Sequence, residues 1–395
     1  MSNKEMACFS FPAVPHALAR ASRGRRALRR ATALALASVA FGSISLPAAA
    51  ATWWSTSPSV SIGSTTINVR NAGARGDGVH NDTAAFQAAI NALPSSGGTI
   101  YVPAGTYMID ALRSINLRSH TRLKMDSSAK LVAIPNSSSR SYVVKAWRVN
   151  NVEITGGSIV GERVKHKGTS GEWGMGVDIL ASAKVYVHDL NVSNCWGDGI
   201  YIGAIGPSGS AVSSTDVTVK NVVSTGNRRQ GLSMGPVQRV YVVNSTFTNT
   251  NGTAPQAGID IEPSTQGASR DIRIEGSTLT GNRGNGLELH DHVTGLVVAS
   301  STLKRNLGFG ALSVGAGNAT FARNTITENG LDGVAMTSTT HDVNISGNTL
   351  TYNSTRWFIA HNKSIYTRTS SARDVQVAST ARNIVLTGNT LSPKP

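Results

Sequence analysis

The chain has 395 residues, of which 40% are hydrophobic and 6% aromatic, and its formal net charge is +15 at pH 7. Aromatic residues are scarce and no block rich in Lys or Arg follows residue 51, so the basic charge does not indicate a nucleic-acid-binding protein. An acidic polysaccharide is a better match for such a charge.

The first 51 residues are typical of a secretory signal peptide. A basic segment ends at Arg30, an apolar run covers residues 31–46, and small residues continue to Ala51. This order predicts export and cleavage, with a mature protein that begins near Thr52 and is secreted or periplasmic. The apolar run is too short to span a bilayer comfortably, so we expect no membrane span after cleavage. Residues 52–395 are expected to form a single domain.

A capping segment is predicted at about residues 67–109. Between Thr83 and Leu93 apolar side chains recur at helical spacing, and Asn81 or Asp82 is suited to cap the start of this helix. Two short strand-like runs joined by Pro-Ala-Gly follow it. The helix is expected to cover one end of the domain.

The stretch GARGDGVHNDTAAFQAAI (residues 73–90), followed by GGTIYVPAGTY (residues 97–107), resembles the N-terminal signature of the pectate-lyase-like superfamily. That superfamily includes polygalacturonase-type hydrolases, phage tailspikes and uronate epimerases. The resemblance implies an all-β fold, a right-handed parallel β-helix with a short N-terminal capping helix, that acts on polysaccharides. Asp77, in the GDG of this signature, is expected to serve a turn.

A glycine-led strand rich in Ile, Leu, Val and Met recurs along the rest of the chain. The glycines are 23 to 32 residues apart, which is typical of a solenoid whose coils stack to bury their apolar faces. We expect roughly ten coils. The repeats begin at Gly176, Gly199, Gly231, Gly258, Gly286, Gly310 and Gly333.

Two outward-facing columns follow from this repeat. Side chains alternate across a strand, so the second and fourth residues after each glycine share the outer face, and stacking brings equivalent residues to about 4.8 Å. The second-position column is polar over five coils and apolar afterwards, which predicts a groove over those five coils. The second-position column is Asp178, Tyr201, Ser233, Asp260, Glu288, Leu312 and Ala335, and the fourth-position column is Leu180, Gly203, Gly235, Glu262, His290, Val314 and Thr337.

Asparagines and two insertions accompany the repeats. The segments 162–175 and 354–382 interrupt the period, and the first adjoins the acidic column, so we expect it to line the groove. Asparagines four residues before a glycine are expected to stack as a hydrogen-bonded ladder. They are Asn227, Asn282, Asn306 and Asn329.

Asp198 lies directly before Gly199, where the chain turns into a strand. The surrounding GDGIYIGAIG (residues 197–206) resembles the GHGISIG-type motif of polygalacturonase-family glycosidases, with Asp in place of His, and that family's NTDGI motif. The family's paired-Asp and Arg-Ile-Lys motifs are absent, so the architecture alone carries over. Residues 161–263 also look like a group of bacterial β-helix proteins that share GEWG, WGDGIYIG and GIDIEP.

These carboxyl groups favour a glycoside hydrolase. Hydrolysis needs one carboxylic acid as proton donor and one carboxylate as base or nucleophile. We predict that Asp198, Asp260 and Glu288 are catalytic, with one of Asp260 and Glu288 kept protonated by its neighbour as the acid and Asp198 as the base. The three side chains are expected to face solvent rather than the core.

Other functions are compatible with the same residues. A polysaccharide lyase or uronate C5-epimerase would need a base and a cation that neutralises a uronate carboxylate, and a surface protein that binds glycans would need neither. The acids could instead bind calcium or be merely solvated; no other cofactor or metal is expected. Trp196 either flanks the groove or fills a turn. The expected substrate-binding residues are Asp178, Tyr201, Arg228, Arg229, Glu262, His290, Asp291, Trp173, Lys165 and His166.

Overall fold

The computed structural model describes residues 52–366 and 374–392, which lie within one compact unit, Thr52–Pro395. The predicted signal peptide, residues 1–51, is outside the described residues. No helix within the described ranges has the length and apolar character needed to cross a membrane.

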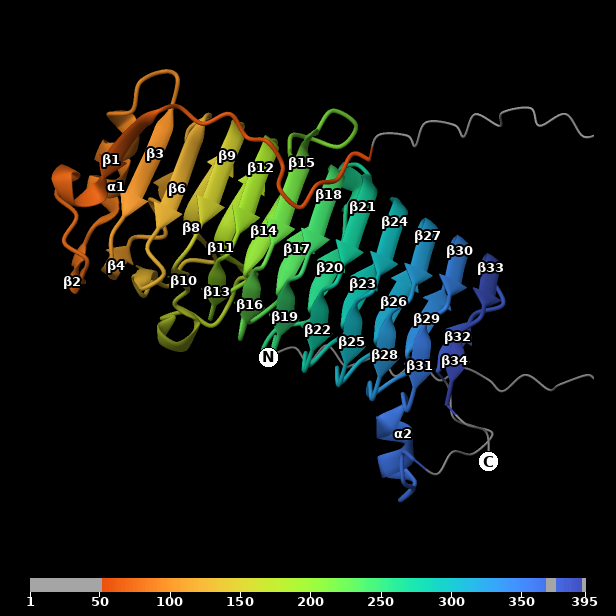
Figure 1. Cartoon of the computed structure of the whole chain (residues 1–395). Helices are drawn as coiled ribbons and strands as arrows, with labels where there is room; N and C mark the ends of the chain where they lie inside the picture. The colour runs from red at the N-terminus through yellow and green to blue at the C-terminus, as the bar shows by residue number, and fades with distance from the viewer. Residues whose placement is uncertain (1–51, 367–373, 393–395) are drawn as a thin grey trace, which may run out of the picture. The chain divides into compact units, whose positions relative to one another are not determined.

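The described residues form a parallel β-helix in which successive coils lie side by side (Figure 1). Each regular coil contributes one strand to each of three parallel sheets, here named sheets A, B and C. Sheet A contains β1 (Thr65–Asn68), β3 (Gly98–Val102), β6 (Thr121–Met125), β9 (Asn150–Thr155), β12 (Ala183–His188), β15 (Val212–Lys220), β18 (Val237–Val243), β21 (Ser269–Glu275), β24 (Val293–Ala299), β27 (Gly317–Ala322), β30 (His341–Ser346) and β33 (Arg382–Thr387). Sheet B contains β2 (Asp77–Asn81), β4 (Gly105–Ile109), β7 (Ala129–Ala133), β10 (Ser158–Val160), β13 (Asn191–Ser193), β16 (Val223–Thr225), β19 (Thr246–Thr248), β22 (Thr278–Thr280), β25 (Thr302–Lys304), β28 (Thr325–Thr327), β31 (Thr349–Thr351) and β34 (Thr390–Leu391).

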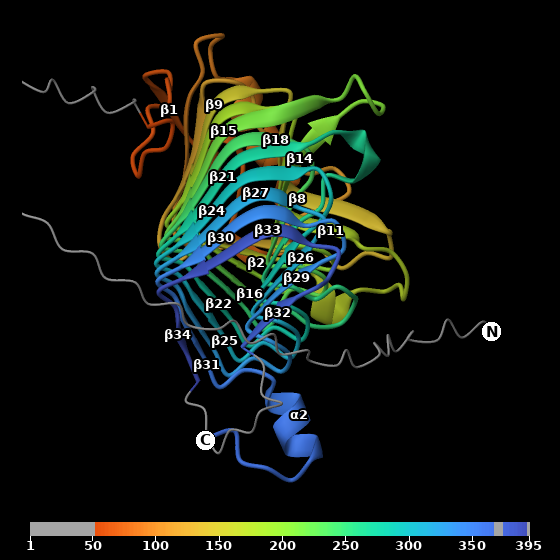
Figure 2. The same ribbon diagram turned by 90° about the vertical axis from the view of Figure 1, so that its right-hand side faces the viewer.

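Sheet C holds the glycine-led strands predicted from the repeat. It is joined to sheet A by a short antiparallel pairing between β14 and β15. Figure 2 shows the coils nearly end on, with loops projecting beside β8, β11 and β14. Sheet C contains β5 (Ile115–Asn116), β8 (Arg140–Trp147), β11 (Trp173–Leu180), β14 (Ile200–Ile205), β17 (Leu232–Met234), β20 (Ile259–Ile261), β23 (Leu287–Leu289), β26 (Ala311–Val314), β29 (Val334–Thr337) and β32 (Val375–Val377).

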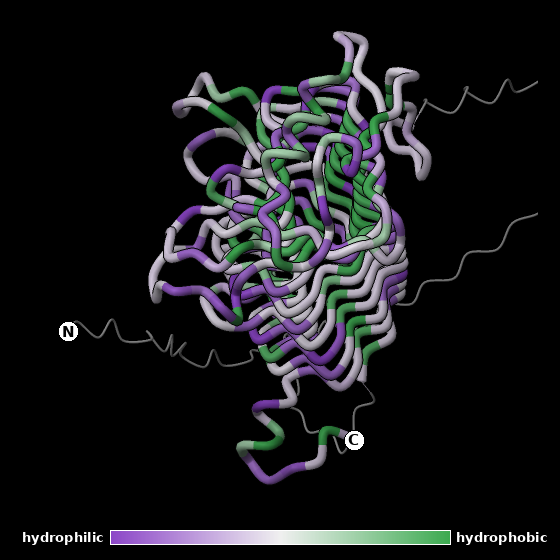
Figure 3. Tube along the Cα trace, turned by 90° about the vertical axis from the view of Figure 1, so that its left-hand side faces the viewer, coloured by the Kyte–Doolittle hydropathy of each residue, from purple (hydrophilic) through white to green (hydrophobic). Residues whose placement is uncertain are grey.

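The core is the apolar interior of the coils. Ile259 and Ile261 of β20 are completely buried, as are Leu287 and Leu289 of the next coil. Apolar residues gather toward the inside of the stacked coils in Figure 3, and polar residues are frequent in the loops. Since an inward residue of each strand packs on its equivalents in neighbouring coils, the interior is continuous and no coil has a core of its own.

The N-terminal end is closed by a short helix, as predicted. Helix α1 (Thr83–Asn91) buries Phe86 and Ile90 against the first coils, after a 3-10 turn η1 (Val69–Ala72). The helix ends at Asn91, slightly before the predicted Leu93. The Asn81 side chain accepts a hydrogen bond from the Thr83 amide.

Two nearby acids serve turns of the backbone. The Asp82 carboxylate accepts hydrogen bonds from the amides of Arg75 and Gly76, so Asn81 rather than Asp82 caps the helix. Asp77 accepts hydrogen bonds from the amides of Val79 and His80, which confirms its predicted turn role.

A ladder of buried amides runs along the solenoid. Asn282 Nδ2 donates to Asn306 Oδ1 at 2.9 Å, and Asn306 Nδ2 donates to Asn329 Oδ1 at 3.0 Å. The predicted ladder is therefore confirmed over these coils. Asn227 is outside it, because the next coil has Thr250 at the equivalent place; Asn227 instead donates to Ser224 Oγ.

Inserted segments project from the regular coils. The first predicted insertion contains the 3-10 turn η2 (Arg163–Lys165), and the second contains helix α2 (Thr355–Ala360). A further 3-10 turn, η3 (Ser264–Gln266), follows β20.

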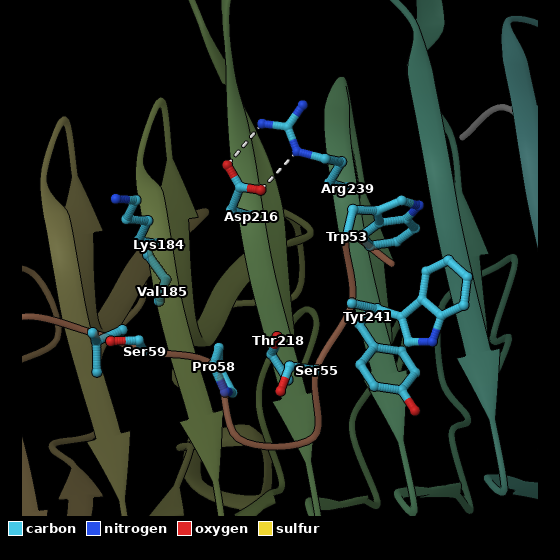
Figure 4. Close-up of a pocket in the computed structure, with 12 residues that line it drawn as sticks. Trp53, Ser55, Pro58, Ser59, Lys184, Val185, Asp216, Thr218, Arg239 and Tyr241 are labelled. Atoms are coloured by element: carbon cyan, nitrogen blue, oxygen red, sulfur yellow. Dashed lines mark hydrogen bonds and ion pairs between the residues drawn. The ribbon is translucent and has the colours of Figure 1, made fainter. Parts of the chain in front are cut away.

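A strap of N-terminal residues, 52–62, crosses the outer face of sheet A (Figure 1). Tyr186 donates to the carbonyl of Thr56, and the Arg273 guanidinium lies 4.7 Å from the centre of the Trp54 ring. Beside the strap is a pocket of about 300 Å³, where Arg239 pairs with Asp216 (Figure 4). Asp216, the one acid in the lining of this pocket, is already paired with Arg239, so we interpret the strap region as a packing feature.

Candidate active site

The predicted outer column of sheet C is confirmed by the strand register. Asp178 pairs with Tyr201, Tyr201 with Ser233, Ser233 with Asp260 and Asp260 with Glu288. The polar column therefore crosses β11, β14, β17, β20 and β23. It forms the floor of a groove on the outer face of these strands.

A third column runs parallel to the two predicted ones. It consists of the residue directly before each strand-leading glycine, and Asp198, Gln230 and Asn285 belong to it. Gln230 donates to Asp260 Oδ2 at 2.7 Å, and Asn285 donates to Glu288 Oε2 at 2.8 Å. This column supports the acids of the second-position column from one side.

A pocket of about 380 Å³ opens over the groove between the first insertion and η3. The wall from the insertion includes Glu172 and Trp173, which confirms the prediction that this segment lines the groove. The lining residues are Glu172, Trp173, Met175, Asp198, Tyr201, Arg229, Ser233, Met234, Glu262, Ser264 and Gln266.

Tyr201 lies across the groove floor because two glycines make room for it. A Cβ atom on Gly203 would lie 2.6 Å from Tyr201 Cε1, and one on Gly235 would lie 2.6 Å from the Tyr201 hydroxyl. A side chain at either place would therefore displace the Tyr201 ring from this position. The ring also lies 6.4 Å from that of Trp173, so two aromatic rings border the pocket.

Asp198 is a buried carboxyl group at the edge of this pocket. Its side chain is fully shielded from solvent, Oδ2 lies 3.4 Å from Arg229 Nη1, and Oδ1 has no hydrogen-bond partner. Burial raises the pKa of Asp198 to about 7; the positive charge of Arg229 and the nearby Ser233 hydroxyl oppose this shift, and Asp260 and Glu262 add to it. Near neutral pH this group can therefore be a proton donor.

Arg229 joins three carboxylates of the pocket. Its nitrogens lie 3.3 Å from Glu172, 3.4 Å from Asp198 and 3.1 Å from Glu262. Burial alone would lower the pKa of Arg229, but the carboxylates of Asp198, Asp260 and Glu262 outweigh it and raise the pKa. Each guanidinium nitrogen therefore lies near an acid of the protein, with hydrogen bonds from the two Nη atoms and an ion-pair contact without a hydrogen bond at Nε.

A second charged group lies on the coil beyond. His290 Nε2 is 3.3 Å from Asp260 Oδ1 and 3.4 Å from Glu288 Oε1, as ion pairs rather than well-aligned hydrogen bonds. The interactions with Asp260 and then Glu288 raise the pKa of His290 to about 10. Burial raises the pKa of Asp260 to about 6. At neutral pH an imidazolium therefore bridges the two acids.

Asp178, at the other end of the column, is a buried acceptor. Trp147 Nε1 donates to Asp178 Oδ2 at 2.7 Å. Burial raises the pKa of Asp178 to about 7, and this hydrogen bond opposes the shift.

The expectation that the three predicted catalytic acids face solvent is wrong for two of them. Asp198 and Asp260 are 0% exposed, and Glu288 retains 12% exposure of its side chain. The backbone frame points all three outward, but Arg229, Gln230 and His290 cover them. Burial is also the largest cause of the raised carboxyl pKa values, ahead of the crowding of acids that the sequence suggested.

Other predicted residues are distributed between the groove and the scaffold. Arg228 lies 3.9 Å over the ring of Trp196 and donates to the Gly171 carbonyl. His166 stacks on the other side of this cluster, 3.8 Å from the Trp196 ring, and its Nδ1 contacts Glu162. Trp196 is buried and so fills a turn. These residues stabilise the first insertion and are not in the pocket lining.

Lys165 and Asp291 are also away from the pocket. Lys165 is exposed on η2, and Asp291 lines a separate surface depression near His341. Trp173, in contrast, is in the pocket wall with 42% exposure.

Several site residues were not identified from the sequence. Gln230 and Asn285 contact acids of the second-position column, and Glu172 contacts Arg229. The repeat defines the position before each glycine in every coil, so the third column could have been predicted. At the sequence level, only Asp198 was considered at this position. Glu172 lies in the GEWG motif, but a sequence cannot say which way an insertion folds.

The acids do not converge as a metal site. Asp260, Glu262 and Glu288 each contact a cationic or amide side chain. Among residues 52–366 and 374–392, no group of three or more His, Cys, Asp or Glu side chains is arranged to hold a metal ion.

Comparison with known proteins shows that the fold is a right-handed parallel β-helix of the kind found in carbohydrate-active proteins. Residues 255–392 match the model of the right-handed beta helix region. Residues 66–283, more than half of the chain, match the model described as "Rhamnogalacturonase A/epimerase, pectate lyase-like". The chain belongs to this family.

The curated relatives are longer proteins. YclG of Bacillus subtilis, described as uncharacterized, is 29% identical over 219 residues, which are 50% of this chain and 38% of YclG. The chain spans less than half the length of the curated relatives it matches.

Solved structures with the same fold have different activities. The A-module of mannuronan C-5 epimerase AlgE6 from Azotobacter vinelandii has a TM-score of 0.61 and 19% identity, with 82% of this chain and 86% of that chain covered. The adhesin PfbA of Streptococcus pneumoniae has a TM-score of 0.56 and 16% identity, with 83% of this chain and 91% of that chain covered. A family 28 exopolygalacturonase of Yersinia enterocolitica has a TM-score of 0.52 and 15% identity, with 82% of this chain and 78% of that chain covered. At these identities the likeness establishes the fold alone.

Proposed function

We propose that the protein is a polysaccharide hydrolase whose active site is the pocket around Asp198, Arg229 and Glu262. The observation that carries the proposal is a buried carboxyl group with a pKa of about 7 and a free oxygen, next to a second carboxylate held by the same guanidinium. Glycoside hydrolysis requires one carboxylic acid as proton donor and a second carboxyl group as base or nucleophile.

The proposed mechanism is inverting, with one group as acid and the other as base. The contacts with one planar guanidinium place Asp198 Oδ2 and Glu262 Oε2 within roughly 9 Å of each other, a limit that includes the separations of about 6.5 to 9.5 Å in inverting glycosidases and also those of about 5 to 5.5 Å in retaining ones. Asp198 stands on β14's edge of the groove, and Glu262 stands two coils further along on the opposite edge. A sugar unit that rests on Tyr201 would lie between them.

The proposed reaction is a single displacement. Asp198 donates its proton to the glycosidic oxygen as the bond from that oxygen to the anomeric carbon breaks. Glu262 takes a proton from a water molecule, whose oxygen forms the new bond to the anomeric carbon. The products are two shorter chains, and the protons on the two acids are restored through solvent.

Asp260 and Glu288, predicted as catalytic from the sequence, have a different place in this proposal. Together they hold His290 as a cation on the coil next to Glu262. The exposed side of the ring can donate to sugar hydroxyl groups, which makes Asp260 and Glu288 positioning residues. This assignment gives the acid role to Asp198, where the sequence favoured Asp260 or Glu288.

The commitment of Arg229 favours hydrolysis over uronate chemistry at this pocket. A lyase or an epimerase needs a cation that neutralises the substrate carboxylate, and each Arg229 nitrogen already faces a carboxylate of the protein.

Incubation of the protein with a panel of anionic and neutral polysaccharides tests the proposal. Reducing ends and the ultraviolet absorbance of unsaturated sugar products would be followed together. We expect new reducing ends without that absorbance, and at least about a hundredfold loss of rate in Asp198→Asn and Glu262→Gln. Unsaturated products would indicate a lyase, proton exchange without cleavage an epimerase, and binding without reaction an adhesin; each would refute the proposal.

The variants Asp260→Asn and Glu288→Gln locate the base. We expect these two variants to lose less of the hydrolysis rate than Glu262→Gln does, because Asp260 and Glu288 act through His290. If they lose as much as Asp198→Asn while Glu262→Gln stays active, the base belongs to the His290 group and the assignment of Glu262 is wrong.

A further inference from the structure

The groove continues beyond the catalytic pocket onto β8. In the register of sheet C, Lys145 pairs with Asp178 and Trp147 with Leu180, and Tyr142 pairs with Met175. These three residues of β8 therefore extend the same three columns that hold Asp198, Tyr201 and Gly203 on β14. They lie two strands from β14, about 9.6 Å along the solenoid axis.

The chemistry of this end of the groove is distinctive. Lys145 Nζ lies beside two aromatic rings that contact each other edge to face, 4.8 Å from the centre of Tyr142 and 4.4 Å from that of Trp147. A second cation, Arg140, lies 4.7 Å over the ring of Trp173, and Trp147 and Trp173 are 37% and 42% exposed.

Lys145 and Arg140 differ from Arg229 in their contacts with acids. Among the described residues, no ion pair involves Lys145 or Arg140, whereas Arg229 pairs with three carboxylates. Asp178 is the acid whose charge acts on Lys145, but it is buried and accepts a hydrogen bond from Trp147. The charge of the groove is thus divided, with unpaired cations on β8 and acids from β14 to β23.

We propose that Tyr142, Lys145, Trp147 and Arg140 form a subsite for a sugar unit that carries a carboxylate. Aromatic faces pack on the apolar faces of sugar rings, and the ammonium and guanidinium groups bind the carboxylate. An anionic chain would then bind with a charged unit at β8 and the scissile bond at Asp198.

This inference rests on the proposed function only in assuming that the groove takes a polysaccharide chain. Binding can therefore be measured without turnover. The probes are oligogalacturonates and oligomannuronates of defined length, and the same oligosaccharides after reduction of each carboxyl group to an alcohol. Titration calorimetry would use the full chain and its variants.

Lys145→Met keeps the side chain's apolar stem and removes the charge. We expect it to weaken binding of at least one anionic probe by about tenfold or more and to leave the affinity for the reduced probes unchanged. Arg140→Met should have the same selectivity. Lys130→Met is the matched control, because Lys130 is exposed on β7 of sheet B, and it should change neither affinity.

The outcomes separate the two proposals. If no anionic probe binds, or if Lys145→Met binds anionic probes as the wild type does, the subsite is refuted whatever the enzyme cleaves. If Lys145→Met loses anionic binding but the wild type cleaves no polysaccharide, the subsite stands and the proposed hydrolase activity fails. Trp147→Phe should weaken binding of anionic and reduced probes alike, since it acts through ring contact.

Discussion

Replacement of Arg229 should move the titration of Asp198 to higher pH. The guanidinium lies 3.4 Å from the Asp198 carboxylate, and two unit charges at this distance interact by about 5 kcal/mol at an effective dielectric constant of about 20. At about 1.4 kcal/mol per pKa unit, removal of the charge could raise the pKa by up to about 3.6 units. In Arg229→Gln the new amide can still donate to Asp198, so we expect a rise of at least about one unit above the wild-type value.

Infrared difference spectroscopy over a series of pH values measures this titration without a substrate. The carboxyl band of Asp198 is assigned by its absence from Asp198→Asn. Arg228→Gln is the matched control, since the neighbouring Arg228 contacts the Trp196 ring and backbone carbonyls and should leave the titration unchanged. An unchanged or lowered Asp198 pKa in Arg229→Gln, or an equal rise in Arg228→Gln, would refute the electrostatic account.

Three further predictions concern stability and the groove floor. Asp198 keeps its proton to about pH 7 when folded, against a usual value of 3.8, so the folded state binds more protons between these values and loses about 4 kcal/mol of stability as the pH rises through them. Measured by denaturant unfolding, the free energy of unfolding of Asp198→Asn minus that of the wild type should therefore increase by about 4 kcal/mol from about pH 4 to about pH 8. A difference that stays constant with pH would contradict the pKa shift. Asn306→Ala leaves donors and acceptors of the buried ladder unpaired and should cost about 3 kcal/mol or more in the same assay; a loss below about 1 kcal/mol would mean that the ladder adds little. Gly235→Ala places a Cβ atom against the Tyr201 hydroxyl and should weaken oligosaccharide binding, whereas an unchanged affinity would show that Tyr201 does not contact the sugar.

The glycine repeat predicted the register of sheet C because register follows from spacing. A one-residue shift would move every apolar side chain of a strand to the outer face, and so the burial of Ile259 and Ile261 fixes the outward position of Asp260. The same logic placed Tyr201, Ser233 and Glu288 in one column. Sequence periodicity was sufficient for this part of the site.

The side chains that cover the polar column of sheet C could not be predicted in the same way. Arg229 lies in a turn, and its contacts with Glu172 and Glu262 come from an insertion and from a coil further along. Side-chain direction outside the repeat depends on packing that no period encodes. For this reason Asp198 was predicted as an exposed base, although it is buried and has the raised pKa of an acid.

The role of Asp198 as the proton donor is tested most directly with leaving groups of different acidity. For the sugar identified by the polysaccharide panel, turnover of the polymer would be compared with turnover of its dinitrophenyl glycoside, whose leaving group departs without a proton. Asp198→Asn should lose at least about a hundredfold on the polymer and less than about tenfold in formation of dinitrophenolate, whereas Glu262→Gln should lose heavily on both. Equal losses on the two substrates in Asp198→Asn would contradict its assignment as the general acid.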